Sequence, residues 1–271
     1  MTPSLHTVFF SPTGSSRNMA QETARVLAQD LAQNMALARD DDWDWTFPEG
    51  RAAAAHTLGP EDVLVFAFPV YAGRIPPLLM DSLARLAGHG ARAVLLAVYG
   101  NRHYDDALLE AVDLFVAKGF SVPAAGAFVA EHSMTAKVGA GRPDAEDMAA
   151  LGDFASRAAR IIASGERANV VVPGNRPYKA LPPAADIRPQ TLDSCTQCGL
   201  CASVCPVRVI DADNAAQVAL GCLRCCACVK ICPEQAKYFD NPQVDKIVAM
   251  LECNCLERRE PEVFFAAAGK M

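Results

Sequence analysis

The sequence has no cysteine in its first 194 residues, and all eleven of its cysteines lie between positions 195 and 255. No apolar run approaches the roughly 18 residues that a membrane-spanning helix needs, so we expect no membrane insertion. Residues 1–14 show neither the basic segment nor the long apolar core of a secretory signal, and we therefore expect a cytoplasmic protein. In that reducing compartment, clustered cysteines indicate metal or redox chemistry rather than disulfides.

The sequence also has no excess of basic residues: it contains 25 lysines and arginines and 31 aspartates and glutamates, which gives a net charge of −6. Nucleic-acid-binding proteins carry a basic stripe that neutralises phosphates, so we expect no nucleic-acid partner. Two nucleotide-binding motifs are also missing, the Walker loop G-x-x-x-x-G-K-[ST] and the dinucleotide motif G-x-G-x-x-G. The five histidines are scattered, and we identify no catalytic residue among them.

The hydrophobic pattern of the first part predicts an α/β fold. The chain has 271 residues, of which 51% are hydrophobic, enough for two domains with buried cores. Strands and helices alternate, which predicts βαβ units and a flavodoxin-like, doubly wound, five-stranded parallel sheet over residues 1–165. We expect strands at 5–10, around 35–39, 63–68, 93–98 and 125–129, and helices at 17–31, at 105–118 capped by Asp105, and at 144–164 capped by Asp144.

The composition changes after residue 165. Five prolines, at positions 173, 177, 182, 183 and 189, indicate a stiff, extended linker over 166–190. We place a small α+β domain at 191–240, where the cysteines begin. The remaining residues, 241–271, are expected to form a C-terminal helix near 245–257 and a tail that docks on the domains.

Eight of the cysteines form one phrase that occurs twice. Both copies read C-x2-C-x2-C-x3-C-P, the spacing of ferredoxin iron–sulfur ligands. Three thiolates on one tight loop can hold three corners of a cubane, and the fourth corner needs a ligand from elsewhere. Two zinc sites are the alternative, but zinc uses C-x2-C pairs separated by a longer segment, which fits this doubled phrase poorly. The phrases contain Cys195, Cys198, Cys201 and Cys205, then Cys222, Cys225, Cys228 and Cys232.

Three loops follow predicted strands and would meet at the carboxyl edge of the sheet, where doubly wound folds bind ligands. The first, F-S-P-T-G-S-S-R-N-M, places hydroxyl and amide donors at a helix start but has no lysine. Such a loop suits a phosphate that is held without a cation, although a capped helix alone would explain it equally well. The loops at 69–77 and 99–106 carry tyrosines, whose rings can lie against an isoalloxazine.

With these loops the first 165 residues resemble the flavodoxins, whose phosphate pattern T/S-x-T-G-x-T/S matches S-P-T-G-S-S. The resemblance implies FMN, with Tyr71 and Tyr104 as candidates for stacking on its ring. The residues implied to bind the phosphate are Ser11, Thr13, Gly14, Ser15 and Ser16, and those implied to flank the ring are Pro69, Val70, Tyr71, Ala72, Gly73, Tyr99, Gly100, Asn101, Tyr104 and Asp105.

The cysteine region resembles the bacterial two-cluster ferredoxins. This resemblance implies two [4Fe-4S] clusters in which each phrase lends its last cysteine to the other cluster. The implied ligand sets are Cys195, Cys198, Cys201 and Cys232 for one cluster, and Cys222, Cys225, Cys228 and Cys205 for the other. The remaining Cys226, Cys253 and Cys255 receive no role, and Cys226 is expected to be a small buried residue.

The whole chain is similar to the EFR-type ferredoxins, a family in which a flavodoxin is fused to a two-cluster ferredoxin. The resemblance implies electron transfer between FMN and the clusters, in a low-potential carrier that links a reductase to a partner enzyme. The alternative is a flavoenzyme, linked to NAD(P)H or to ferredoxin, that reduces a small substrate at the FMN. We expect redox proteins as donor and acceptor, and the sequence leaves open whether the protein is itself an enzyme.

Overall fold

The computed structural model describes residues 3–32, 38–53, 55–183 and 185–267. Five parallel strands run through its N-terminal part: β1 (Ser4–Phe9), β2 (Ala38–Asp44), β4 (Val63–Pro69), β6 (Arg92–Tyr99) and β7 (Ser121–Val129). Their order across the sheet is β2-β1-β4-β6-β7. Counting these strands alone, that is the 2-1-3-4-5 order of flavodoxin-like folds, so the predicted doubly wound sheet is confirmed.

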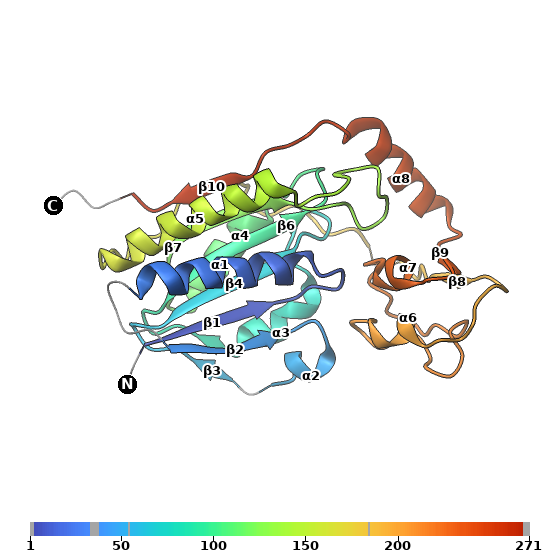
Figure 1. Ribbon diagram of the computed structural model, residues 1–271, viewed down its shortest axis with the longest axis horizontal. Coiled ribbons are helices and arrows are strands. Elements are labelled where there is room, and N and C mark those ends of the chain that lie inside the picture. The colour runs from blue at the N-terminus through green and yellow to red at the C-terminus, as the bar shows by residue number, and fades with distance from the viewer. Residues whose placement is uncertain (1–2, 33–37, 54, 184, 268–271) are drawn as a thin grey trace.

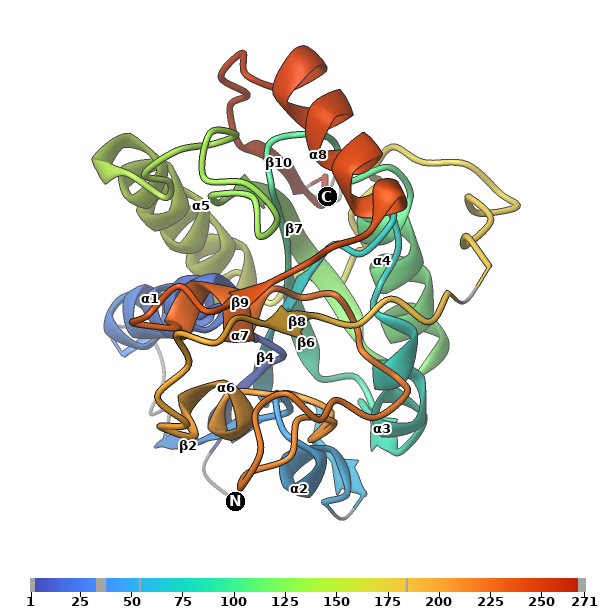
Figure 2. The same ribbon diagram turned by 90° about the vertical axis from the view of Figure 1, so that its right-hand side faces the viewer.

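Helices cover both faces of this sheet (Figures 1 and 2). On one face α1 (Ser15–Leu31) and α5 (Ala145–Ala163) enclose a core that includes Phe9, Leu27, Phe128 and Phe154. On the other face lie α3 (Met80–Ala84) and α4 (Ala107–Ala117), over a core built around Phe66 and Phe115. Shorter elements complete this part: α2 (Pro48–Arg51), η1 (Pro77–Leu79), and the paired strands β3 (His56–Thr57) and β5 (Leu86–Ala87).

Two predicted boundaries differ from the structure. The second strand spans Ala38–Asp44 and so includes the acidic segment that we expected to follow it; positions 35–37 lie outside the described residues. The helix expected at 105–118 begins at Ala107, and Asp105 is not its cap. Asp105 instead has a positive φ of 45° and pairs with Lys179 of the linker at 2.6 Å. The cap by Asp144 is confirmed, since its side chain accepts from the amides of Glu146 and Asp147.

A sixth strand comes from the tail. β10 (Glu262–Phe265) pairs antiparallel with β7, opposite residues Ala124 to Ala127, and so covers an edge that would otherwise be open (Figure 1). The ring of Phe265 packs on Phe154 at a centroid distance of 5.5 Å and lies under the Arg157 guanidinium. The tail is therefore part of the sheet, which the sequence analysis did not anticipate.

The cysteine region lies at the end of the molecule that faces the carboxyl ends of the parallel strands (Figures 1 and 2). It contains α6 (Leu200–Ser203), α7 (Ala227–Ile231) and the antiparallel pair β8 (Gln190–Thr191) and β9 (Lys237–Tyr238). α8 (Pro242–Asn254) follows and leads back toward the sheet. Within the described residues, no helix is both long and apolar enough to cross a bilayer.

Asn101 fastens the segment after α8 to the loop behind β6. Its buried side-chain amide donates to the carbonyl oxygens of Cys255, at 2.7 Å, and Glu257, at 2.8 Å. Its carbonyl oxygen accepts from the Arg259 amide at 3.1 Å. One side chain thus satisfies three backbone groups of the tail.

We expect Asn101→Ala to lower the free energy of unfolding by about 1–3 kcal/mol, because it leaves backbone groups of the tail without partners. Denaturant unfolding under anaerobic conditions measures the change. Asn254→Ala is the matched control, because Asn254 is exposed and bonds only the Met250 carbonyl of its own helix. That variant should stay within about 0.5 kcal/mol of the parent. Equal losses in both variants would contradict the fastening role of Asn101.

Candidate flavin and iron–sulfur sites

The loop before α1 offers free hydrogen-bond donors. Gly14 adopts a left-handed conformation, with φ of 92°, at the start of the helix. The hydroxyl of Ser11 accepts from the Arg17 amide at 2.9 Å, and the Ser11 amide donates to Thr46 Oγ1 at 3.0 Å. In the part of the chain that the structure describes, the amides of Thr13, Ser15 and Ser16 have no protein partner. A helix N-terminus with such free amides can hold a phosphate.

The loop after β4 is a tight turn. Tyr71 and Arg74 exchange two backbone hydrogen bonds of 3.0 Å, and Ala72 and Gly73 between them have positive φ values of 52° and 83°. Both central residues are left-handed, as in a type I′ turn, and a glycine suits the second position. A Cβ on Gly73 would also collide with the Asp105 carboxylate, so the turn is pressed against the next loop.

The side chain of Arg74, the last residue of this turn, is bound by other groups of the protein. Its guanidinium binds the Glu110 carboxylate with two hydrogen bonds, of 2.8 and 2.5 Å, and donates to the Lys179 carbonyl at 2.8 Å. The pKa of Arg74 is raised chiefly by the hydrogen bond to Glu110. Arg74 therefore connects the turn to α4 and to the linker.

Two residues on the loop after β6, Tyr104 and Asn101, were predicted to contact the flavin, but their side chains bind the tail of the chain. Tyr104 is 1% exposed, and its hydroxyl donates to Glu262 of β10 at 2.7 Å. A ring buried in this way has no face open to a ligand, which argues against the stacking role. His103, stacked on Tyr104 at 5.0 Å, takes the exposed place on this loop. The side chain of Asn101 is occupied by the tail, so only its backbone is left for a cofactor.

The two cysteine phrases have the same backbone pattern. Positive φ values occur at Gln197 and Arg224, before the second cysteine of each phrase, and at Gly199 and Cys226, directly after it. They occur again three residues after the last cysteine, at Arg208 and Gln235. Cys226 is therefore the counterpart of Gly199, and each of the two precedes a short helix, α7 or α6. Such agreement at three positions indicates that both phrases form the same loop.

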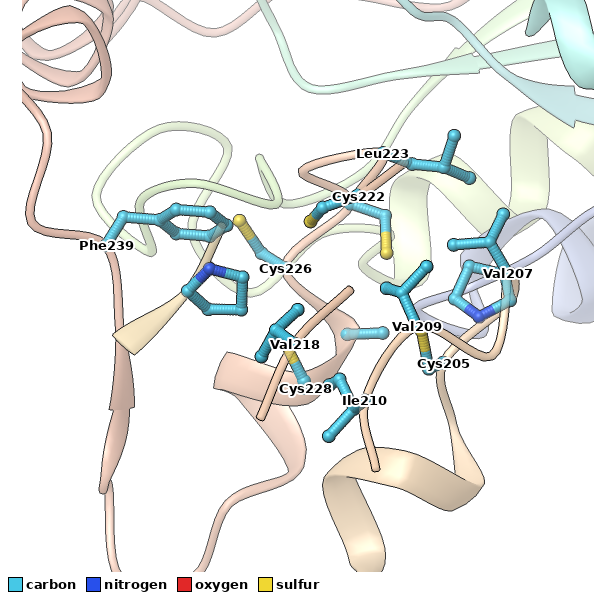
Figure 3. A pocket seen from close by; sticks show the side chains of 14 residues that line it. Cys205, Val207, Val209, Ile210, Val218, Cys222, Leu223, Cys226, Cys228 and Phe239 are labelled. Carbon is cyan, nitrogen blue, oxygen red and sulfur yellow. The ribbon is translucent and has the colours of Figure 1, made fainter. Parts of the chain in front are cut away.

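One pocket joins cysteines from both phrases. Cys222, Cys225 and Cys228 line it together with Cys205 of the first phrase (Figure 3). This is one of the two ligand sets that the resemblance implied. The rest of the lining is almost wholly apolar, including Val207, Val209, Ile210, Val218, Leu223 and Phe239.

Burial raises the pKa of both Cys225 and Cys228 to about 12, so their thiols remain protonated without a cation. Iron would reverse this, because a bound cation stabilises the thiolate in an apolar site. The sulfur of Cys222 accepts from the Arg224 amide at 3.4 Å, and that of Cys232 from the Ala236 amide at 3.2 Å. Both ligand sets thus have amides directed at sulfurs, as iron–sulfur sites use to tune potential.

The other set, Cys195, Cys198, Cys201 and Cys232, is less fully described. Cys195 is close enough to Cys201 to raise the pKa of that thiol, after the larger effect of burial. Among the described residues, no three His, Cys, Asp or Glu side chains converge as ligands of a single metal ion. A four-iron cluster does not require such convergence, because each cysteine thiolate would bind a different iron atom and the four cysteine sulfurs would not meet at one point.

Tyr71 brings the two candidate sites together. Its ring is partly buried and packs on the same core as Val70 and as Leu223 of the second cysteine phrase. Burial raises the pKa of the Tyr71 hydroxyl well above its ordinary value, and Cys225, Cys226 and Cys222 act in the same direction. Tyr71 of the predicted flavin loop therefore lies close to the cysteine pocket.

The loop after β7, residues 130–143, contributed no residue to the site predicted from the sequence. Glu131 pairs with Lys230 of α7 at 2.6 Å, and Val138 packs on Leu251 and Cys255. Burial, and then Lys230 and Arg102, lower the pKa of His132 to about 4. The position of this loop at the carboxyl end of a strand was the available signal, but it has neither an aromatic residue nor a phosphate motif.

Comparisons with known proteins bear on both parts of the chain. Residues 191–211 match the protein family described as 4Fe-4S binding domain. No curated protein matches the chain. A flavodoxin-like domain followed by a 4Fe-4S binding region is thus the arrangement of this chain.

Solved structures give weaker likenesses, in each case to part of the chain. A Streptococcus pneumonia TIGR4 flavodoxin is 22% identical, over 58% of this chain and 98% of that one, with a TM-score of 0.37. An oxidoreductase from Corynebacterium diphtheriae is 17% identical, over 60% and 96%, with a TM-score of 0.43. The rubredoxin oxygen:oxidoreductase of Desulfovibrio gigas is 14% identical, over 60% of this chain but only 37% of that one, with a TM-score of 0.39. At these TM-scores the likenesses decide neither cofactor nor activity.

The low pKa of His132 predicts acid sensitivity. Unfolded chains take up a proton near the ordinary pKa of 6.5, whereas the folded protein does so only near 4. Stability from this group is therefore complete above pH 6.5 and is lost as the pH falls toward 4. We expect His132→Asn to flatten the fall of melting temperature over this range. His89→Asn, at an exposed loop position, should keep the slope of the parent. Equal slopes in all three proteins would show that His132 is not responsible.

Proposed function

We propose that the chain transfers electrons internally between FMN and two [4Fe-4S] clusters, and carries low-potential electrons between a reductase and a partner enzyme. The observation that carries this proposal is that Tyr71, on the predicted flavin loop, lies close enough to Cys222 and Cys225 for both to raise the pKa of its hydroxyl, while Leu223 packs on the same core as Tyr71. Electron transfer needs the two centres close together. A chain that merely contained both domains would not need this proximity.

FMN is favoured over FAD and NAD by the donors at the first loop. Three free amides at the start of a helix of 17 residues suit a terminal phosphate. The nearest cation, Arg17, is engaged with Asp44 at 3.4 Å, so the phosphate would be held by neutral donors. Tyr71, which is only partly buried, is the remaining stacking candidate. Tyr104 is not proposed again.

Two crossed clusters are supported by the pocket at Cys205, Cys222, Cys225 and Cys228, which draws its ligands from both phrases. The matching backbone of the two phrases extends the argument to Cys195, Cys198, Cys201 and Cys232. When bound, FMN supplies two-electron capacity and each cluster supplies one-electron capacity. The residues of this chain then hold the centres together, and the apolar lining keeps water away from the inner cysteines.

A flavoenzyme is the second candidate, favoured by a polar pocket that His103, Asp105, Asp106 and Lys179 line beside the flavin loop. Its polar groups are, however, largely paired with one another. Lys179 binds Asp105 at 2.6 Å, and Asp106 accepts from the Asn175 amide at 2.8 Å. Because so few groups are free to bind a substrate, we favour the carrier. Turnover of NADH or NADPH with small acceptors would support the flavoenzyme instead.

The crossed ligation is tested by Cys232→Ser. The parent should contain about eight iron and eight sulfide per chain, and the variant about half. Alkylation followed by mass spectrometry should find Cys195, Cys198 and Cys201 newly reactive, because their cluster has lost its fourth ligand. Cys253→Ser, at an exposed cysteine outside both phrases, should keep all the iron. New reactivity at Cys222, Cys225 and Cys228 would show that the ligation is not crossed. A parent that contains zinc in place of iron would refute the clusters altogether.

The phosphate site is tested by the double variant Thr13→Ala, Ser16→Ala. Each hydroxyl bonded to a charged phosphate is worth about 1.5–3 kcal/mol, so FMN affinity should fall at least tenfold. Titration of the flavin-free protein with FMN, followed by flavin fluorescence, gives the affinity. Ser164→Ala is the control, because its hydroxyl bonds the Ile161 carbonyl at the far end of α5. An unchanged affinity in the double variant would place the phosphate elsewhere.

A further inference from the structure

The exposed face around Cys198 is where, we propose, a one-electron redox protein docks; this inference rests on the proposed function. The cluster of Cys195, Cys198, Cys201 and Cys232 is then the outer port. The cluster of Cys205, Cys222, Cys225 and Cys228 is the inner relay to the flavin. The electrons pass in the order flavin, inner cluster, outer cluster, partner, or in reverse.

Contacts between the two parts of the chain gather around the inner set. Next to Cys205, the Pro206 carbonyl accepts from Arg51 at 2.8 Å, and Arg208 lies over the Phe47 ring at 4.4 Å. Leu223, next to Cys222, packs on the sheet core with Tyr71. In contrast, residues 192–204 make no hydrogen bond or ion pair to residues before 166 within the described part of the chain. The segment that carries the first three cysteines is therefore not held against the flavodoxin-like part by such contacts.

Exposure follows the same division. In the inner set, Cys205, Cys225 and Cys228 are 6%, 9% and 8% exposed, and Cys222 is partly exposed. In the outer set Cys201 is buried, at 7%, but Cys195 and Cys232 are partly exposed and Cys198 is exposed. Two apolar side chains on the same segment are also exposed, Leu192 at 46% and Leu200 at 42%. A cysteine ligand at the surface, flanked by exposed leucines, is what a transient redox partner needs for close approach.

The charge of this face sets the chemistry of the partner. Between Pro189 and Val207, Asp193 is the only charged residue in the sequence. Attraction between opposite charges therefore contributes little, and the partner would dock through an uncharged, partly apolar face of its own. Each oxidised partner accepts one electron from the outer cluster, which is refilled by one electron from the inner cluster. A flavin that holds two electrons thus serves two partner molecules, and releases its protons to solvent.

Because the segment around Cys198 carries only one charged residue, Asp193, a single charge introduced there should change the rate of encounter. The probe is ferric cytochrome c, a basic one-electron acceptor, mixed with the reduced holoprotein at low ionic strength. We expect Leu200→Glu to speed the bimolecular reduction two- to threefold, and Leu200→Lys to slow it by about as much. Val171→Glu and Val171→Lys are the matched controls, since Val171 is 88% exposed on the linker. Both should react at the parent rate.

Hydrogen exchange gives a second readout that does not depend on turnover. Zinc-substituted cytochrome c, which accepts no electron from the clusters, should protect residues 192–204 and leave 69–74 unchanged. The proposed docking face would be refuted by any of three results. Charges at positions 171 and 200 could change the rate equally, charges at position 200 could have no effect, or residues 192–204 could show no protection. Iron, flavin and the rate of flavin–cluster exchange after flash reduction are measured in every variant. If iron, flavin or internal exchange is missing from the parent, the proposed function itself fails. If the parent has iron, flavin and internal exchange but charges at position 200 do not change the rate of cytochrome c reduction, only the proposed docking face is refuted.

Discussion

The seating of the cysteine region on the carboxyl edge of the sheet is the constraint on which the rest of the molecule depends. Asn101 holds the segment after α8, Glu131 holds α7 through Lys230, and Arg51 holds the chain beside Cys205. Each anchor lies in a segment that follows the carboxyl end of a strand: Asn101 and Glu131 in the loops after β6 and β7, and Arg51 in α2 after β2. The loops that surround a ligand in a doubly wound fold therefore serve here as a platform as well. This explains why the side chain of Asn101, which was predicted to lie beside a flavin, forms its hydrogen bonds with the tail instead.

The doubled cysteine phrase imposes a second constraint. Equivalent left-handed residues recur in both copies, so the two loops are built alike, yet they face different surroundings. Cys226 stands where the first copy has Gly199, and it is buried beside the pocket while its counterpart is partly exposed. Most side chains adopt a left-handed conformation only at a cost. Cys226 adopts it where the mainly apolar side chains of the pocket surround it.

Much of the fold could be predicted from local pattern, because buried parallel strands and helix caps leave their mark within a few residues. The continuous runs of β4 and β6 and the cap by Asp144 are of this kind. The tail strand could not be found, since β10 is short and gains its place only by pairing with β7, far away in the sequence. The stacking role predicted for Tyr104 rested on local pattern in the same way. The sequence showed that Tyr104 lies in a loop, whereas its burial depends on Glu262, far away in the sequence.

The difference in burial between the two cysteine sets also orders them energetically, if both bind clusters as proposed. Reduction adds negative charge to a cluster, and an apolar surrounding disfavours charge. Backbone amides are directed at sulfurs in both sets, so this influence acts on both clusters. The difference in burial then sets the order of the two reduction potentials, and the inner cluster should be harder to reduce than the outer one. An inner relay of this kind is rarely occupied for long. Electrons would instead reside on the flavin or at the exposed cluster, from which a partner can take them.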